Sequence, residues 1–170
     1  MDQAYLNQRA EPSEKDQVMQ LVGFVIGKEQ FGVDILSVQE IIRSASITAV
    51  PNSPDFIEGV INLRGSIIPV IDLRKRLNLP LKKKEEGSAT WILIINVDER
   101  VTGFIVDSVT KVLKIQTKTI EPPPDIVVAG LKSQYIHGVC EIENGLLILL
   151  DFSRILQIKE IKKLKDFDED

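Results

Sequence analysis

The chain carries one pattern of segments twice, and this repeat constrains the fold more than any other feature. Phe56-Ile-Glu-Gly-Val60 resembles Tyr135-Ile-His-Gly-Val139, and an apolar run follows each of them. Each run ends at a similar helix start, Asp72-Leu-Arg-Lys-Arg-Leu77 in the first half and Asp151-Phe-Ser-Arg-Ile-Leu156 in the second. Residues 38–42 and 109–113 also resemble each other. The repeat predicts that the 170 residues build one five-strand unit twice.

Most of the pattern indicates short strands, because apolar runs rich in β-branched residues alternate with turn signals. The expected strands are residues 19–26, 31–34, 46–50, 60–63, 67–71, 91–95, 101–106, 117–120, 135–142 and 146–150. The spacing of apolar residues predicts a short helix over 35–42, whereas 108–113 fits a strand or a short helix. Further helices are expected over 72–77 and from Phe152 onward.

A mostly β chain with many short strands favours small barrels, since closure removes the sheet edges. Two such barrels packed side by side would bury a third apolar layer between them. The repeat leaves open which strands belong to which barrel, because strands can exchange between the halves. The apolar stripe of the terminal helix fits either docking onto its own barrel or binding to a partner.

The break between two apolar runs at Asn62-Leu-Arg-Gly65 predicts a tight hairpin turn with Arg64 at its tip. Gly65 supplies the positive φ that such a turn needs. Pro69 has no N–H to donate, which favours an edge position or a bulge. Asp72 is suited to cap the following helix.

The residue types offer little for catalysis. His137 is the only histidine, which excludes a His-based zinc site, and Cys140 lies in an apolar strand as buried structural thiols do. The glycines do not form a phosphate-binding loop, and Asp34 and Asp107 fit local capping. We therefore expect no catalytic residue, no metal, no cofactor and no enzymatic activity.

Charge and composition bear on partners and compartment. A net charge of −4 and an aromatic content of 5% disfavour nucleic acid, whose binding needs basic surface and stacking faces. The single cysteine fits a reducing compartment. Residues 1–17 are polar, are expected to be disordered, and lack the apolar core of a signal peptide. We expect a cytoplasmic protein, monomeric when free, without membrane insertion.

The segment from Phe56 to Leu73 follows the pattern F-I-x-G-V-x-N-L-R-G-x-I-x-P-V-x-D-L. It resembles the signature of the CheW family, the adaptor proteins of bacterial chemotaxis, and the resemblance extends to residues 31–41 and 103–109. It covers about residues 18–158 and implies two SH3-like five-stranded barrels packed together, with short helices. In this interpretation the two subdomains switch near 78–90, and residues 159–170 form the end of a C-terminal helix and a tail.

The resemblance implies a non-catalytic scaffold that couples chemoreceptors to the histidine kinase CheA in membrane-associated arrays. It implies that a groove between the barrels holds the receptor's cytoplasmic tip, lined by Val38, Glu40, Arg64, Gly103 and Val109. From the residues alone, Arg64 and Glu40 also fit ordinary solvated positions, or an ion pair with each other.

A second surface is needed for the regulatory domain of CheA, and the loop around Pro123 and Ile126 is the candidate. Its prolines lose less entropy on ordering, and its apolar residues suit a contact. The same residues would also fit packing onto their own barrel, and Glu121 departs from the basic residue often found there. The competing class of function is a small-barrel module that binds peptides or nucleic acid outside chemotaxis.

Overall fold

The computed structural model describes residues 17–80, 90–123, 133–143 and 145–156. Its strands are β1 (Val18–Ile26), β2 (Glu29–Asp34), β3 (Val38–Arg43), β4 (Ile57–Leu63), β5 (Ser66–Asp72), β6 (Trp91–Val97), β7 (Arg100–Val106), β8 (Ser108–Gln116), β9 (Ile136–Ile142) and β10 (Gly145–Leu150). Its short helices are the 3-10 turns η2 (Ile35–Ser37), η3 (Thr117–Thr119) and η5 (Ser133–Tyr135), and the α-helices α2 (Leu73–Arg76) and α3 (Phe152–Leu156).

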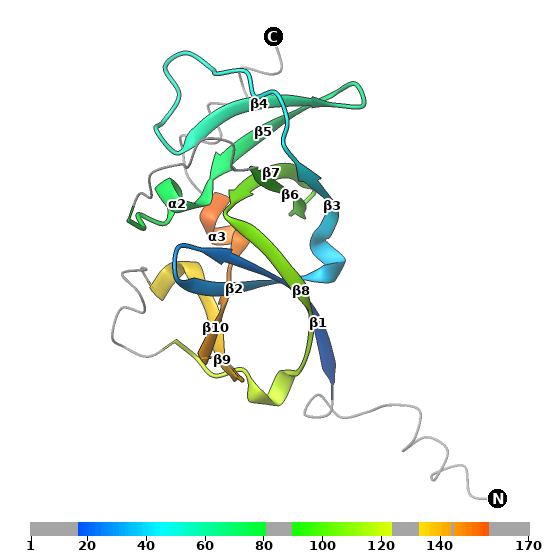
Figure 1. Cartoon of the computed structure of the whole chain (residues 1–170), viewed down its shortest axis with the longest axis vertical. Coiled ribbons are helices and arrows are strands. Elements are labelled where there is room, and N and C mark those ends of the chain that lie inside the picture. Colours follow the sequence, from blue (N-terminus) through cyan, green and yellow to red (C-terminus); the bar gives the residue numbers. More distant parts are fainter. Residues whose placement is uncertain (1–16, 81–89, 124–132, 144, 157–170) are drawn as a thin grey trace, which may run out of the picture.

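The strands form two five-stranded mixed sheets, one above the other in Figure 1. We call them barrel A, with strand order β8-β1-β2-β10-β9, and barrel B, with strand order β3-β6-β7-β5-β4. Neighbouring strands are antiparallel except β2 with β10 and β5 with β7, which are parallel. The two orders match strand for strand, with β1 equivalent to β6, β2 to β7, β8 to β3, β10 to β5 and β9 to β4. The predicted repeat and the mostly β class are confirmed.

The chain crosses between the barrels twice. Barrel B is one continuous stretch from β3 to β7, whereas barrel A takes β1 and β2 from one end of the chain and β8 to β10 from the other. The crossings lie at η2, after Asp34, and at Asp107, between β7 and β8. Residues 78–90, where the sequence predicted the switch between subdomains, do not separate the barrels, because β5 and β6 on either side both belong to barrel B. In each half of the repeat, the first hairpin (β1–β2 or β6–β7) therefore belongs to the barrel whose other three strands come from the other half.

In each sheet a single bridge joins the segment after one edge strand to the opposite edge strand. Thr48 exchanges two backbone hydrogen bonds of 2.9 Å with Val60 on the edge strand β4, and Glu121 exchanges two of 2.8 Å with Val139 on β9. Pro69 lies opposite Val60 on the interior strand β5, so of the two expected positions the edge is wrong, whereas a bulge does occur next to it, between Ile57 and Gly59 on the paired strand. It needs no N–H there, because the backbone of Val60 bonds to Thr48 and the β5–β7 pairing begins only at Val70.

Three apolar layers hold the molecule together. The largest joins both barrels and includes Phe24, Phe31, Phe104 and Phe152. Smaller clusters fill the inside of barrel B and the inside of barrel A. Strand β6 is apolar on both faces because Leu93 and Ile95 face the middle layer while its other buried isoleucines face the interior of barrel B. The predicted third layer between the barrels is confirmed.

Some predicted elements differ in the structure. Residues 35–42 form a 3-10 turn and then strand β3, not a helix. The cause is a bulge between Val38 and Glu40, which breaks the alternation of the strand and leaves apolar residues at helix-like spacing. Residues 46–50 contribute only the Thr48 bridge, and 117–120, expected as a strand, begin with the turn η3 (Thr117–Thr119). The terminal helix is described only as α3, so its stripe beyond Leu156, like residues 1–16, lies outside the described residues.

Candidate partner-binding surfaces

The β4–β5 hairpin has a two-residue turn made of Arg64 and Gly65, because Leu63 pairs with Ser66. Both turn residues have positive φ, 50° and 90°, as the turn that matches the twist of two strands requires. The Asn62 carboxamide accepts the N–H of Gly65 at 2.9 Å. A Cβ on Gly65 would meet nothing within 4 Å, so backbone conformation alone requires glycine there. The predicted turn is confirmed.

Arg64 reaches back from this tip to the edge strand β3. Its Nη2 lies 2.8 Å from Oε1 of Glu40, so the ion pair that was one of the possibilities is formed. The Arg64 side chain is 75% exposed and that of Glu40 is 30% exposed. Such an exposed pair contributes about 0–1 kcal/mol to folding. Its main effect is therefore to hold a guanidinium in one place on the surface.

Val38 and Val109 occupy equivalent places at the beginning of β3 and β8. Val38 pairs with Ile95 and Val109 with Phe24, and both valines are half-buried against the middle layer. Each therefore lies just past a crossing between the barrels. We use the name β3–β8 surface for these two valines together with the Arg64–Glu40 pair.

Gly103 does not belong to this surface. It is buried in β7, paired with Ile94 on one side and with Val70 on the other. A Cβ there would lie 3.0 Å from Ile92 Cγ2, inside the apolar cluster of barrel B. A partner has no access to it, so its absent side chain serves packing.

Sequence reasoning missed several exposed apolar side chains. Ile41 on β3 is 40% exposed, Val112 on β8 is 50% exposed, and Ile67 beside the hairpin tip is 53% exposed. The helical interpretation of 35–42 had turned Ile41 inward, which concealed it. The edge strands β3 and β8 and the hairpin tip therefore carry exposed apolar side chains as well as charged ones.

The candidate kinase loop is only partly described. Pro123 is half-buried and follows the bridge of Glu121 to Val139, whereas Ile126 lies outside the described residues. The bridge holds the start of this loop against barrel A. Whether the apolar residues of the loop pack inward or face a partner stays a prediction.

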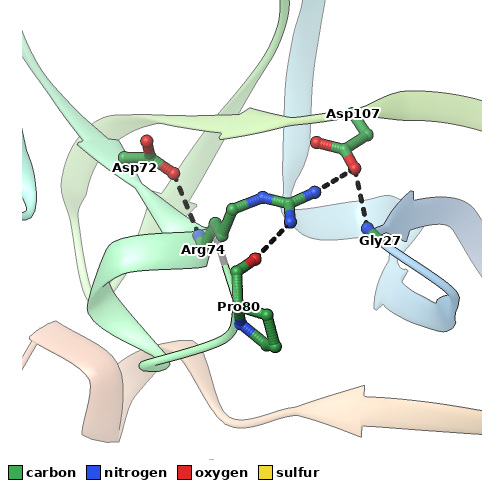
Figure 2. Close-up of polar contacts among 5 residues, drawn as sticks. All are labelled: Gly27, Asp72, Arg74, Pro80 and Asp107. Carbon is green, nitrogen blue, oxygen red and sulfur yellow. Dashed lines mark hydrogen bonds and ion pairs between the residues drawn. The ribbon is translucent and has the colours of Figure 1, made fainter. Parts of the chain in front are cut away.

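Asp107 forms a polar cluster that joins the barrels (Figure 2). Its Oδ2 accepts the N–H of Gly27 at 2.7 Å and pairs with the Arg74 guanidinium, which also donates to the carbonyl of Pro80. The Arg74 side chain is only 11% exposed. Gly27 belongs to barrel A and Arg74 to the helix after β5 of barrel B. The cluster therefore links the two barrels at the second crossing. Sequence reasoning treated Asp107 only as a local cap. The signal that could have revealed the cluster is a difference between the two halves of the repeat, since Arg74 in the first half matches Ser153 in the second.

The remaining reactive groups have structural positions. Cys140 is buried in β9, and burial raises the pKa of its thiol, which makes it a poor nucleophile. His137 is exposed on the same strand. Within the described ranges, no three His, Cys, Asp or Glu side chains lie close enough to hold a metal ion. No helix in that part of the chain is long and apolar enough to cross a membrane.

Comparison with known proteins assigns the family. The model of the CheW-like domain matches residues 20–160. The chain belongs to the CheW family. Relatives named chemotaxis protein CheW include one from Treponema pallidum, 35% identical over 151 residues that span 88% of each chain, and one from Klebsiella aerogenes, 38% identical over 138 residues that span 81% of each.

The fold agrees as well. The crystal structure of the scaffolding protein TtCheW from Thermoanaerobacter tengcongensis superposes with a TM-score of 0.77 at 33% identity, covering 85% of this chain and 96% of that one. Two packed five-stranded barrels are therefore the CheW fold. As a member of this family, the protein is a non-catalytic chemotaxis scaffold.

Proposed function

We propose that this protein couples chemoreceptors to the histidine kinase CheA by holding the receptor's cytoplasmic tip on the β3–β8 surface. The observation that carries the proposal is the Arg64–Glu40 pair, which fixes a mostly exposed guanidinium beside half-buried Val38 and Val109. Apolar side chains supply contact area, and a positioned charge sets register and orientation. Gly103 is left out of the proposed contact because it is buried.

The kinase contact is proposed on barrel A, through the loop that begins at Pro123 and contains Ile126. The expected partner is the regulatory domain of CheA, which is similar to this fold and would pair barrel end to barrel end. Support comes from the Glu121 bridge, which fixes the backbone just before Pro123 on barrel A. Two surfaces on one rigid pair of barrels would let receptor state control the kinase without any reaction by the scaffold.

The proposed setting is the bacterial cytoplasm, with the protein monomeric when free and recruited to membrane receptor arrays through its partners. The net charge of −4 argues against nucleic acid as a partner. Titration calorimetry with the isolated regulatory domain of a cognate CheA tests the coupling role. One-to-one binding at about micromolar affinity supports it; absence of binding between two folded proteins contradicts it.

Reversing the charge of Arg64 tests the receptor surface. Arg64→Glu should change the free energy of unfolding by less than about 1 kcal/mol, because the pair it breaks is exposed. It should weaken binding to a receptor cytoplasmic fragment at least about tenfold, since the introduced carboxylate would repel the groups that the guanidinium attracts. Lys28→Glu, the same charge change in the exposed β1–β2 turn, is the control and should bind normally. Normal receptor binding by the Arg64 variant would remove Arg64 from the contact.

A further inference from the structure

A cavity of about 290 Å³ lies at the first crossing between the barrels, and none of the residues of the β3–β8 surface lines it. Three carboxylates do line it, from Asp34 at the end of β2, Asp98 in the β6–β7 turn and Asp151 before α3. Its other walls combine apolar side chains, among them Leu21, Val33, Leu149 and Phe152, with polar ones that include Asn96. Among the described residues that line it, none is a lysine or an arginine and one, His137, is a histidine. Carboxylates thus outnumber the one histidine, and the cavity is acidic.

The internal repeat gives this cavity an occupied counterpart. Asp98 holds the place in the β6–β7 turn that Gly27 holds in the β1–β2 turn, because the pairs Val97–Arg100 and Ile26–Glu29 close both turns. Ser153 likewise stands two residues after Asp151, as Arg74 stands two residues after the helix cap Asp72. At the second crossing, the Arg74 guanidinium fills the space beside Gly27 and pairs with Asp107.

At the first crossing Ser153 takes the place of that arginine. Its side chain is too short to span the space, and Ser153 and Asp98 both line the cavity instead. The carboxylates beside them have only partial compensation. Asp34 accepts the N–H of Leu36 at 3.0 Å, and Asp151 lies 3.5 Å from Arg154, whose side chain is 61% exposed. Where one crossing holds a guanidinium from its own chain, the other holds an acidic cavity.

We propose that this cavity binds an arginine side chain of a partner protein. A guanidinium carries five donors in a planar fork that matches carboxylates, and it loses less hydration than an ammonium group. The volume lies just below the roughly 300–1,000 Å³ of small-molecule sites, which suits one side chain. Leu36, 90% exposed, lies between the lining residues Asp34 and Ser37 and adds an apolar contact at the rim for residues flanking the arginine. This inference goes beyond the adaptor role and does not depend on it.

The test is a titration of the ¹⁵N-labelled full chain with N-acetyl-arginine methylamide, followed by amide chemical shifts. Binding of one side chain should be weak, on the order of millimolar, with shifts centred on Gly32, Asp98 and Ser153. N-acetyl-citrulline methylamide, which has nearly the same shape without the charge, should cause none of them. Equal shifts with citrulline or with the corresponding lysine compound would contradict recognition of a guanidinium, and shifts scattered over exposed carboxylates would contradict a defined site.

Variants locate the site independently. Asp34→Asn combined with Asp98→Asn keeps a helix cap and a turn residue that tolerates positive φ, so the fold should persist. This variant should bind the probe at least about tenfold more weakly, since charged hydrogen-bond acceptors are lost. Asp55→Asn, at a 92% exposed carboxylate outside the cavity, is the matched control and should bind normally. Ser153→Arg should place a guanidinium in the cavity from within and abolish probe binding. Unchanged binding by either cavity variant would overturn the proposal.

Discussion

The helices α2 and α3 hold equivalent places after β5 and β10, yet they fasten the two barrels in different ways. Helix α2 carries three basic residues, of which Arg74 ties Asp107 and Arg76 lies between the rings of Phe56 and Tyr135. Helix α3 buries Phe152, Ile155 and Leu156 in the middle layer. Because α2 also buries Leu73 in this layer, its polar contacts add to the apolar packing that both helices share.

This difference has a consequence for function. Polar contacts at the second crossing hold Gly27 and Asp107 at defined distances, whereas apolar packing by α3 leaves a cavity at the first crossing. The two sides of one pseudo-symmetric junction are thus unequal. An adaptor with two similar barrels can in this way present different surfaces to different partners.

Removing the apolar contact of α3 should have the largest effect on stability. Phe152 is 7% exposed and packs edge-on against Phe104, with ring centroids 4.9 Å apart. Phe152→Ala should lower the free energy of unfolding by about 3–5 kcal/mol, through lost burial and the cavity left behind. Urea unfolding followed by the fluorescence of Trp91 measures it. A loss below about 1 kcal/mol would mean that α3 contributes little to the junction.

Removing the polar contact of α2 should cost less. Arg74→Ala leaves the Asp107 carboxylate without its guanidinium, which should lower the free energy of unfolding by about 1–3 kcal/mol. Arg154→Ala, at the exposed pair with Asp151, is the control and should cost about 0–1 kcal/mol. Urea unfolding measures both losses. Equal losses would show that the Arg74–Asp107 contact stabilises the fold no more than an exposed ion pair does.

Two equivalent glycines, Gly103 in barrel B and Gly32 in barrel A, allow the packing of the two barrels to be compared. An added Cβ would lie 3.0 Å from Ile92 at Gly103, but no closer than 3.3 Å to any side chain at Gly32. Gly103→Ala should therefore destabilise by about 1–3 kcal/mol through overpacking, and Gly32→Ala by less. Thermal unfolding measures both. If Gly103→Ala reduced receptor binding without lowering stability, the glycine would be a partner contact after all.

The cap of α2 should respond to pH, and this is the smallest effect expected. Burial raises the pKa of the Asp72 carboxyl above its ordinary value, although the Arg74 N–H donates to it at 3.0 Å. The folded state thus holds this proton more tightly than the unfolded chain, so the stability that protonation contributes is present at low pH and lost as pH rises through the folded pKa.

Asp72→Asn keeps the cap but cannot ionise. The stability of this variant minus that of the wild type should increase as pH rises from about 3 to about 7, as denaturant curves at each pH would measure. Asp151→Asn, the same substitution at the start of α3, is the control for the effect of replacing a capping aspartate by asparagine on stability. A flat difference for Asp72→Asn would contradict the raised pKa.

Several features of the candidate site were predictable from local sequence. The Asn62-Leu-Arg-Gly65 turn and the capped helix after Asp72 depend on backbone preferences of a few adjacent residues, so they were predicted correctly. The helix over 35–42 was wrong because the bulge after Val38 depends on pairing with β6, more than fifty residues away in sequence. Gly103 was misplaced for a similar reason, since its burial comes from neighbours on two other strands.

By itself, the sequence determined that one unit is repeated, that strands dominate, and that Arg64 lies at a hairpin tip, because these follow from local spacing and residue type. Only the tertiary structure decided which strands share a barrel, that Arg64 meets Glu40, and that Arg74 closes one crossing while Ser153 leaves the other open. The physical reason is that pairing and packing join residues distant in the chain. Local propensities, which are similar in both halves, cannot distinguish a strand that stays with its own half from one that pairs with the other.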